Sequence, residues 1–162
     1  MNSIKQTPMT RLSANRITTW GLALGLLLLG GWLLFQPLSQ AADVVVYKSP
    51  TCGCCNAWIR HLEAHGFKVE VHDQLDMNPI KAELGVPMVY RSCHTAKVGN
   101  YVVEGHVPAD LITRMLEDRP PIKGLAVPGM PMGSPGMEGP SKDAYQVLTF
   151  DAQGRSTVYA NR

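Results

Sequence analysis

The sequence has little excess charge of either sign outside its first forty residues. Of its 15 Lys and Arg residues, three lie in residues 1–41, which leaves 12 against 13 Asp and Glu. No basic stripe is present, so the composition argues against nucleic acid as a partner. A chain of 162 residues is also too short for two domains of ordinary size, and we expect one core with attachments.

Only one long hydrophobic run is present, and it follows three basic residues near the beginning of the chain. Residues 17–35 are mostly apolar, which after a positive segment is typical of an export leader. Ser39 and Ala41 suit a signal-peptidase cut ahead of Ala42, whereas the length of the run approaches the ~20 residues that span a bilayer. Residues 1–41 are therefore predicted to be a signal peptide or a membrane anchor. Residues 42–162 are predicted to lie in the periplasm, where an anchor would be their link to the inner membrane.

Strand and helix patterns alternate after the leader. A β-branched run opens the domain, Trp58, Ile59 and Leu62 recur at helical spacing, and Gly99-Asn100 separates two short strand patterns. The predicted elements are strand 43–49, helix 56–66, strand 67–73, helix 78–85, strands 95–98 and 101–105, and helix 108–119. This order, βαβ then helix, β-hairpin and helix, predicts an α/β, thioredoxin-like domain with its first two strands parallel.

The rest of the chain is predicted to be a loop and a hairpin. Residues 120–140 are so rich in Pro and Gly, with several Met residues, that we expect a long surface loop without regular structure. Residues 145–160 contain two strand patterns around a Gly-containing turn and predict a terminal β-hairpin.

Cysteines are few, but three of the four lie within the stretch SPTCGCC. Cys52 and Cys55 form a C-x-x-C motif where a strand meets a helix N-terminus, a setting that favours thiolate. An exported protein with four cysteines ordinarily suggests two disulfides, but here that framework would close at least one very small loop. The C-x-x-C alone suits both a redox dithiol and a metal site.

The third cysteine of the stretch favours a metal site. In an oxidoreductase, Cys54 would offer competing disulfides, whereas a soft metal gains a ligand from each added thiolate. The predicted topology adds Cys93 and His94, because the third strand should run antiparallel to the first and begin at the same end of the sheet. The fourth strand returns to that end and brings His106 close.

The remaining histidines and the methionines are weaker candidates. His61 and His65 lie on one helix too far from Cys55 to share its site, and a solvated helix face explains them better. Met130, Met132 and Met137 lie in the Gly/Pro loop, where they serve either as hydrophobic anchors or as thioether donors that select Cu(I).

The order of these motifs resembles a known family. SPTCGCC, LGVP, SCHTA, EGHVPADLI and GLAVPGMPMGSPGME follow one another as in the CopG-type periplasmic copper-resistance proteins, which are thioredoxin-like metal-binding proteins. The resemblance implies a multinuclear Cu(I)–thiolate cluster on Cys52, Cys54, Cys55 and Cys93. Its other motif positions fall on His94, His106, Met130 and Met132.

The sequence therefore predicts an exported copper-binding protein of copper resistance and homeostasis. Copper, as Cu(I)/Cu(II), is the expected cofactor, and other periplasmic copper-handling proteins are the expected partners. Whether copper is stored, passed on or changed in oxidation state, as a copper oxidoreductase would do, stays open. One alternative is a periplasmic thiol–disulfide oxidoreductase using Cys52 and Cys55, and another is a structural zinc domain.

Overall fold

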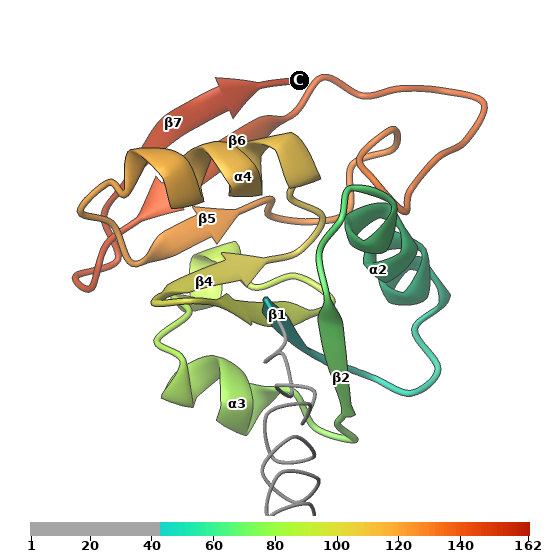
Figure 1. Cartoon of the computed structure of the whole chain (residues 1–162), viewed down its shortest axis with the longest axis horizontal. Coiled ribbons are helices and arrows are strands. Elements are labelled where there is room, and N and C mark those ends of the chain that lie inside the picture. The colour runs from blue at the N-terminus through green and yellow to red at the C-terminus, as the bar shows by residue number, and fades with distance from the viewer. Residues whose placement is uncertain (1–42) are drawn as a thin grey trace, which may run out of the picture. The chain divides into compact units, whose positions relative to one another are not determined.

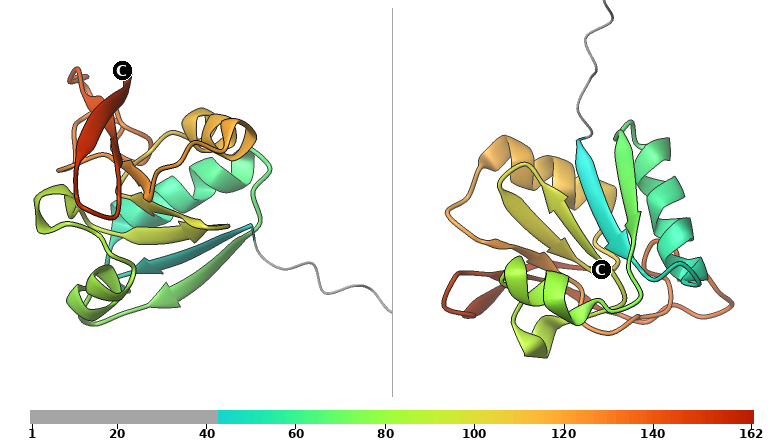
Figure 2. Two further views of the ribbon diagram at one scale, coloured as in Figure 1. Left: turned by 90° about the vertical axis from the view of Figure 1, so that its left-hand side faces the viewer. Right: turned by 90° about the horizontal axis from the view of Figure 1, so that it is seen from below.

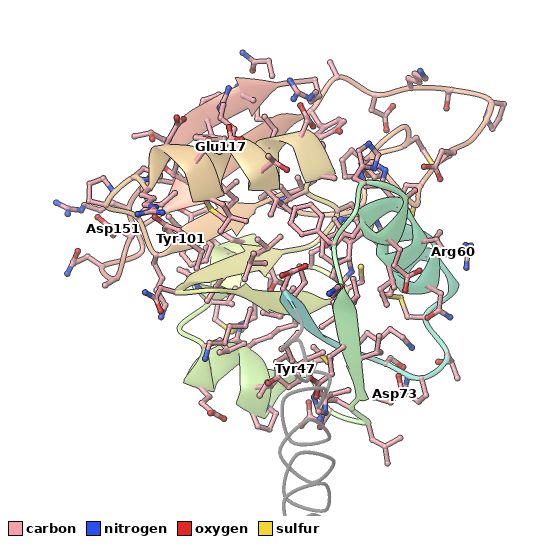
Figure 3. The ribbon with its side chains drawn as sticks, viewed as in Figure 1. Tyr47, Arg60, Asp73, Tyr101, Glu117 and Asp151 are labelled. Carbon is pink, nitrogen blue, oxygen red and sulfur yellow. A yellow bond between two sulfur atoms is a disulfide. The ribbon has the colours of Figure 1, made fainter. Side chains whose placement is uncertain are left out.

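A βαβ unit opens the part of the chain described by the computed structural model, residues 43–162. Strand β1 (Val44–Lys48) leads into helix α2 (Gly53–Ala64), and β2 (Val69–Asp73) returns parallel to β1, as predicted. The buried residues of α2 recur at i, i+3, i+4 and i+7, which gives the helix one apolar face: Cys55, Trp58, Ile59 and Leu62. Arg60 lies on the outer side of α2 and points away from the sheet (Figure 3).

The next elements confirm the predicted helix, hairpin and helix. A short helix α3 (Asn78–Glu83) and a 3-10 turn η1 (Met88–Tyr90) precede β3 (Thr95–Val98) and β4 (Tyr101–Glu104). β3 pairs antiparallel with both β1 and β4, and Gly99 takes the positive φ of 57° that the tight turn requires. Helix α4 (Ala109–Asp118) follows.

The Pro/Gly segment contains a strand, so the prediction that residues 120–140 lack regular structure is wrong. Strand β5 (Gly124–Ala126) is fully buried between β4 and β6. Its first residue must be glycine, because a Cβ there would lie 1.8 Å from the Val102 carbonyl oxygen. A three-residue apolar run, too short to show a strand pattern in the sequence, thus forms an internal strand of the sheet. The loop itself begins after this strand.

The last two strands, β6 (Gln146–Phe150) and β7 (Ser156–Asn161), pair as an antiparallel hairpin and extend the same sheet. The seven strands take the order β2-β1-β3-β4-β5-β6-β7 (Figure 1). Helices α2 and α4 cover one face of this sheet, and α3 lies on the other (Figure 2).

Each face of the sheet has its own apolar cluster. The larger cluster packs α2 and α4 against β1, β3, β4 and β5, with Trp58, Leu62, Ile112 and Met115 at 0% exposure. The smaller one joins Val86 to Val102, Ala126 and Phe150 on the α3 side. Burial of these side chains, at about 25 cal/mol per Å² of apolar surface, supplies most of the driving force for the fold.

The predicted leader, residues 1–41, lies outside the described residues, and so does its division into signal peptide or anchor. Within residues 43–162, no helix has the length and the apolar character needed to cross a membrane.

A histidine of α2 caps the N-terminus of α4. Pro108, at the N-cap position, makes no side-chain capping bond, and the Ala109 N–H instead donates to Nε2 of His61 at 3.1 Å. Burial lowers the pKa of His61, as does neighbouring His65, while Glu138 and Asp110 oppose the shift. The sequence suggested that His61 lies on a solvated helix face, but its imidazole instead bonds to the first residue of α4 and so links the two helices.

We expect the free energy of unfolding to fall at acid pH partly through His61. Because its folded-state pKa lies below 6.5, the stabilisation is complete above that pH and is lost as the pH falls below it. His61→Leu should lose about 1 kcal/mol at pH 7.5 and show a shallower decline between pH 7 and pH 5, measured by urea unfolding. Exposed His72, changed to Gln, is the control. An unchanged slope in His61→Leu would contradict the capping role.

Candidate metal centre

Residues 52–55, which we call the cysteine turn, lie where the chain passes from β1 into α2. Cys52 is the N-cap of α2, and its Sγ accepts the Cys55 backbone N–H at 3.3 Å, while Cys54 and Cys55 lie in the first helical turn. Cys55 is fully buried, whereas Cys52 and Cys54 are partly exposed. The strand-to-helix junction predicted for the C-x-x-C motif is confirmed.

Two of the four cysteines are oxidised in this structure. Cys52 and Cys55 form a disulfide, and Cys54 and Cys93 are free thiols. The spacing of the cysteines disfavoured a two-disulfide framework, and the single disulfide found here follows from the C-x-x-C motif. The first turn of a helix brings residues i and i+3 onto one side, where their sulfurs meet.

Cys93 joins the cysteine turn from the far side of the sequence. Antiparallel pairing of β3 with β1 sets the beginning of β3 beside the end of β1, with Thr95 opposite Tyr47. The Sγ atoms of the four cysteines all lie within 4.8 Å of one another, and those of Cys52 and Cys54 are 3.4 Å apart. The four cysteines among the metal ligands predicted from the sequence are thus brought together.

Cys93 also belongs to a second donor group with two histidines. Its Sγ lies 3.2 Å from Nδ1 of His94 and 3.0 Å from Nε2 of His106, and the three donor atoms fall within the same 4.8 Å limit. Both imidazoles are fully buried. The other ring nitrogen of His94, Nε2, is buried without a hydrogen-bond partner among the described residues.

Burial shapes the protonation of this second group. It raises the pKa of the Cys93 thiol to about 12, with Cys54 adding to the shift. It lowers the pKa of His94 well below the ordinary value, helped by His106 and Lys81, and also lowers the pKa of His106. At neutral pH the two imidazoles are therefore uncharged with lone pairs available, and the Cys93 thiol keeps its proton.

The methionines have a different placement. Met130 is 51% exposed, so its side chain is not a buried anchor, and Met132 and Met137 are half-buried. The backbone of Met132 is held by Asp143, whose carboxylate accepts the Met132 N–H at 3.0 Å and whose N–H donates to the Met132 carbonyl at 2.9 Å. The loop thus has fixed backbone anchors while the side chain of Met130 remains accessible.

Trp58 supports the site, although its sequence pattern indicated only a core position. Its indole Nε1–H donates to the Val107 carbonyl at 2.8 Å, next to His106, and its ring lies 4.2 Å from that of His94. A large aromatic side chain on the first helix after a cysteine turn was the available signal. The contacts it makes are with His94 and Val107, which lie 36 and 49 positions further along the chain.

A buried ion pair on the α3 face holds the segment that carries Cys93. Lys81 Nζ lies 2.5 Å from Oε1 of Glu104, and the same oxygen accepts the Ser92 backbone N–H at 2.5 Å. Thr95 donates to the other carboxylate oxygen at 2.6 Å. Burial raises the pKa of Glu104, while the Lys81 charge and these hydrogen bonds oppose that rise. The pair was not predicted from the sequence, since neither residue has a local signal of burial.

The fold and the donor atoms define a class: mixed α/β proteins that gather cysteine and histidine side chains at one end of a sheet. A family described as "Protein of unknown function, DUF411" matches residues 90–137. Two solved structures, titled "Copper resistance protein copG- Form 1" and "Form 2", are each 48% identical to this chain, with a TM-score of 0.71. The matches cover 76% of this chain and 98% and 99% of those chains.

The chain belongs to the CopG-type copper-resistance family, as the motif order indicated. Its mixed α/β fold with a seven-stranded sheet is similar to that of the CopG structures. No curated protein matches the sequence.

We expect Lys81→Met to lower the free energy of unfolding by about 3–5 kcal/mol, because it leaves the fully buried Glu104 carboxylate without its counter-charge. Combining it with Glu104→Leu should restore part of the loss. Urea unfolding measures both. Lys48→Met is the matched control, since its partner Asp73, labelled in Figure 3, is 54% exposed and can be solvated. A loss for Lys81→Met no larger than for Lys48→Met would contradict the role of the buried pair.

Proposed function

We propose that this protein binds copper on Cys52, Cys54, Cys55 and Cys93 when all four are reduced. The observation that carries the proposal is the group of four sulfurs within 4.8 Å of one another. Thiolates prefer Cu(I), and four that lie this close can bridge more than one ion. The titles of the two CopG structures, which name copper resistance, support copper as the metal.

His94 and His106 are the nitrogen donors of this proposal. They share Cys93 with the thiolate group, so the site offers a sulfur-rich and a mixed sulfur–nitrogen environment side by side. Sulfur favours Cu(I) and nitrogen tolerates Cu(II), which supports Cu(I)/Cu(II) interconversion as a further property of the site.

The remaining parts of the proposal concern the domain type and the cellular compartment of the protein. The order β1-α2-β2, α3, β3-β4, α4 supports the proposal of a thioredoxin-like domain, to which β5, β6 and β7 would be additions. An export leader in residues 1–41 would place the domain in the periplasm, where copper-handling proteins would be its partners.

A second candidate function is thiol–disulfide exchange. The disulfide between Cys52 and Cys55 at the start of α2 favours it, because Cys52 is partly exposed while Cys55 is buried, as attacking and resolving thiols should be. This function requires no metal. An insulin-reduction assay on metal-free protein tests it, and activity there would support exchange in addition to copper binding.

We expect the reduced protein to bind more than one Cu(I) per chain with strong preference over Zn(II), and the disulfide form to bind less. The reason is that Cys52 and Cys55 cannot act as thiolate ligands while they are bonded to each other. Anaerobic competition titration with a Cu(I) chelator, followed by elemental analysis, measures the stoichiometry.

Cys93→Ser separates the full site from a local one. It should reduce the copper load while the domain stays folded, because Cys93 lies just before β3 and outside the cysteine turn. An unchanged load would confine the site to residues 52–55. A single tightly bound zinc, with no tight copper, would reject the proposal.

Met130 and Met132 are proposed to present thioether sulfur to Cu(I), supported by the exposure of Met130. Replacing both with Leu keeps volume and apolarity, so the change in stability should stay under about 1.5 kcal/mol. Copper affinity or the rate of copper transfer should fall, because a soft donor is lost. Thermal melts and Cu(I) competition on the same double variant test this, and unaltered copper handling would contradict a donor role for both residues.

A further inference from the structure

The loop after β5 crosses directly over the first turn of α2. At Gly136, a Cβ would lie 2.7 Å from the Cys54 carbonyl oxygen and 2.7 Å from the Trp58 backbone nitrogen. The φ of this residue, +85°, also disfavours any side chain. Gly136 therefore allows the loop backbone to touch the helix turn that carries Cys54 and Cys55.

The residue before this close approach contacts a histidine of the site. Nδ1 of His106 lies 2.7 Å from the Pro135 carbonyl oxygen. A carbonyl only accepts hydrogen bonds, so Nδ1 must carry the proton. In a neutral imidazole the other nitrogen then has a free lone pair, and this Nε2 lies 3.0 Å from Sγ of Cys93.

Short hydrogen bonds hold this part of the loop in one conformation. The Ser134 hydroxyl, fully buried, donates to the Pro131 carbonyl at 2.7 Å, and the Met137 N–H donates to the Ser134 carbonyl at 2.8 Å. The Gly136 N–H donates to the Glu138 carboxylate at 2.8 Å. With its neighbours fixed, the Pro135 carbonyl cannot swing away from His106 without opening the turn.

We propose that Pro135 and Gly136 are positioning residues for His106. The contact of Gly136 with α2 sets the depth of the loop, and the Pro135 carbonyl holds His106 as the Nδ1–H tautomer with Nε2 directed at Cys93. A carbonyl that fixes the tautomer and ring orientation of a histidine is the usual support for a metal-binding imidazole. This inference adds positioning residues to the proposed copper site. Its expected effect on copper affinity rests on the proposed function, whereas the tautomer of His106 does not.

The tautomer of His106 is measured on metal-free protein by long-range ¹H–¹⁵N NMR, which distinguishes Nδ1–H from Nε2–H. Wild-type protein should show Nδ1–H, and Gly136→Ala should shift His106 toward Nε2–H or a mixture. Gly129→Ala is the matched control, because Gly129 also has a positive φ, +72°, in the same loop, but a Cβ added to it would have no neighbouring atom within 4 Å. It should keep the wild-type tautomer.

Copper affinity supplies the second measurement. If His106 is a ligand, Gly136→Ala should weaken Cu(I) binding by about 10- to 100-fold relative to Gly129→Ala. An Nε2–H tautomer in wild-type protein, or an unchanged tautomer in a folded Gly136→Ala, would overturn the proposal. Should Gly136→Ala fail to fold, Glu138→Gln, which weakens the bond from the Gly136 N–H, takes its place with the same expectations. Wild-type protein that binds no copper would reject the proposed function and leave the tautomer result standing.

Discussion

Antiparallel pairing of β3 between β1 and β4 is the constraint on which the site depends. Thr95 pairs with Tyr47 on one side and with Glu104 on the other. The end of β1, the beginning of β3 and the end of β4 therefore lie side by side at the same end of the sheet. The cysteine turn, Cys93 and His106 follow or precede these strand ends. A shift of one residue in either register would turn the side chains of β3 to the opposite face of the sheet and displace the segment before it, which carries Cys93.

Packing on both faces then fixes the donor atoms. On the α2 side, Trp58 contacts His94 and bonds to the residue after His106, so one side chain organises both imidazoles. On the α3 side, the Lys81–Glu104 pair binds the Ser92 backbone and sets where the chain enters β3. Residues with no donor role therefore determine the distances between those that have one. The loop over α2 adds a third support through Pro135.

Much of this arrangement could be predicted from the sequence, because the strong signals were local. Hydrophobic periodicity and turn residues gave the βαβ unit and the hairpin, and chain topology then implied that Cys93 and His106 meet the cysteine turn. Strand β5 was missed because three residues between prolines show no period, and its burial comes from neighbours on both sides. The Lys81–Glu104 pair and the cap from His61 join residues 23 and 48 positions apart, which no local pattern indicates.

The cysteine turn and the mixed histidine group differ in how far apart their residues lie along the chain, and this sets the order in which they form during folding. Cys52, Cys54 and Cys55 are neighbours as soon as the first turn of α2 exists, an event of microseconds or less. Cys93 and His106 arrive only with the long-range pairing of β1, β3 and β4, and such non-local contacts form more slowly. Until that pairing forms, the cysteine turn has its three thiols without Cys93, His94 or His106 beside them. Metal that arrives at that stage meets a different ligand set from the one the finished domain offers.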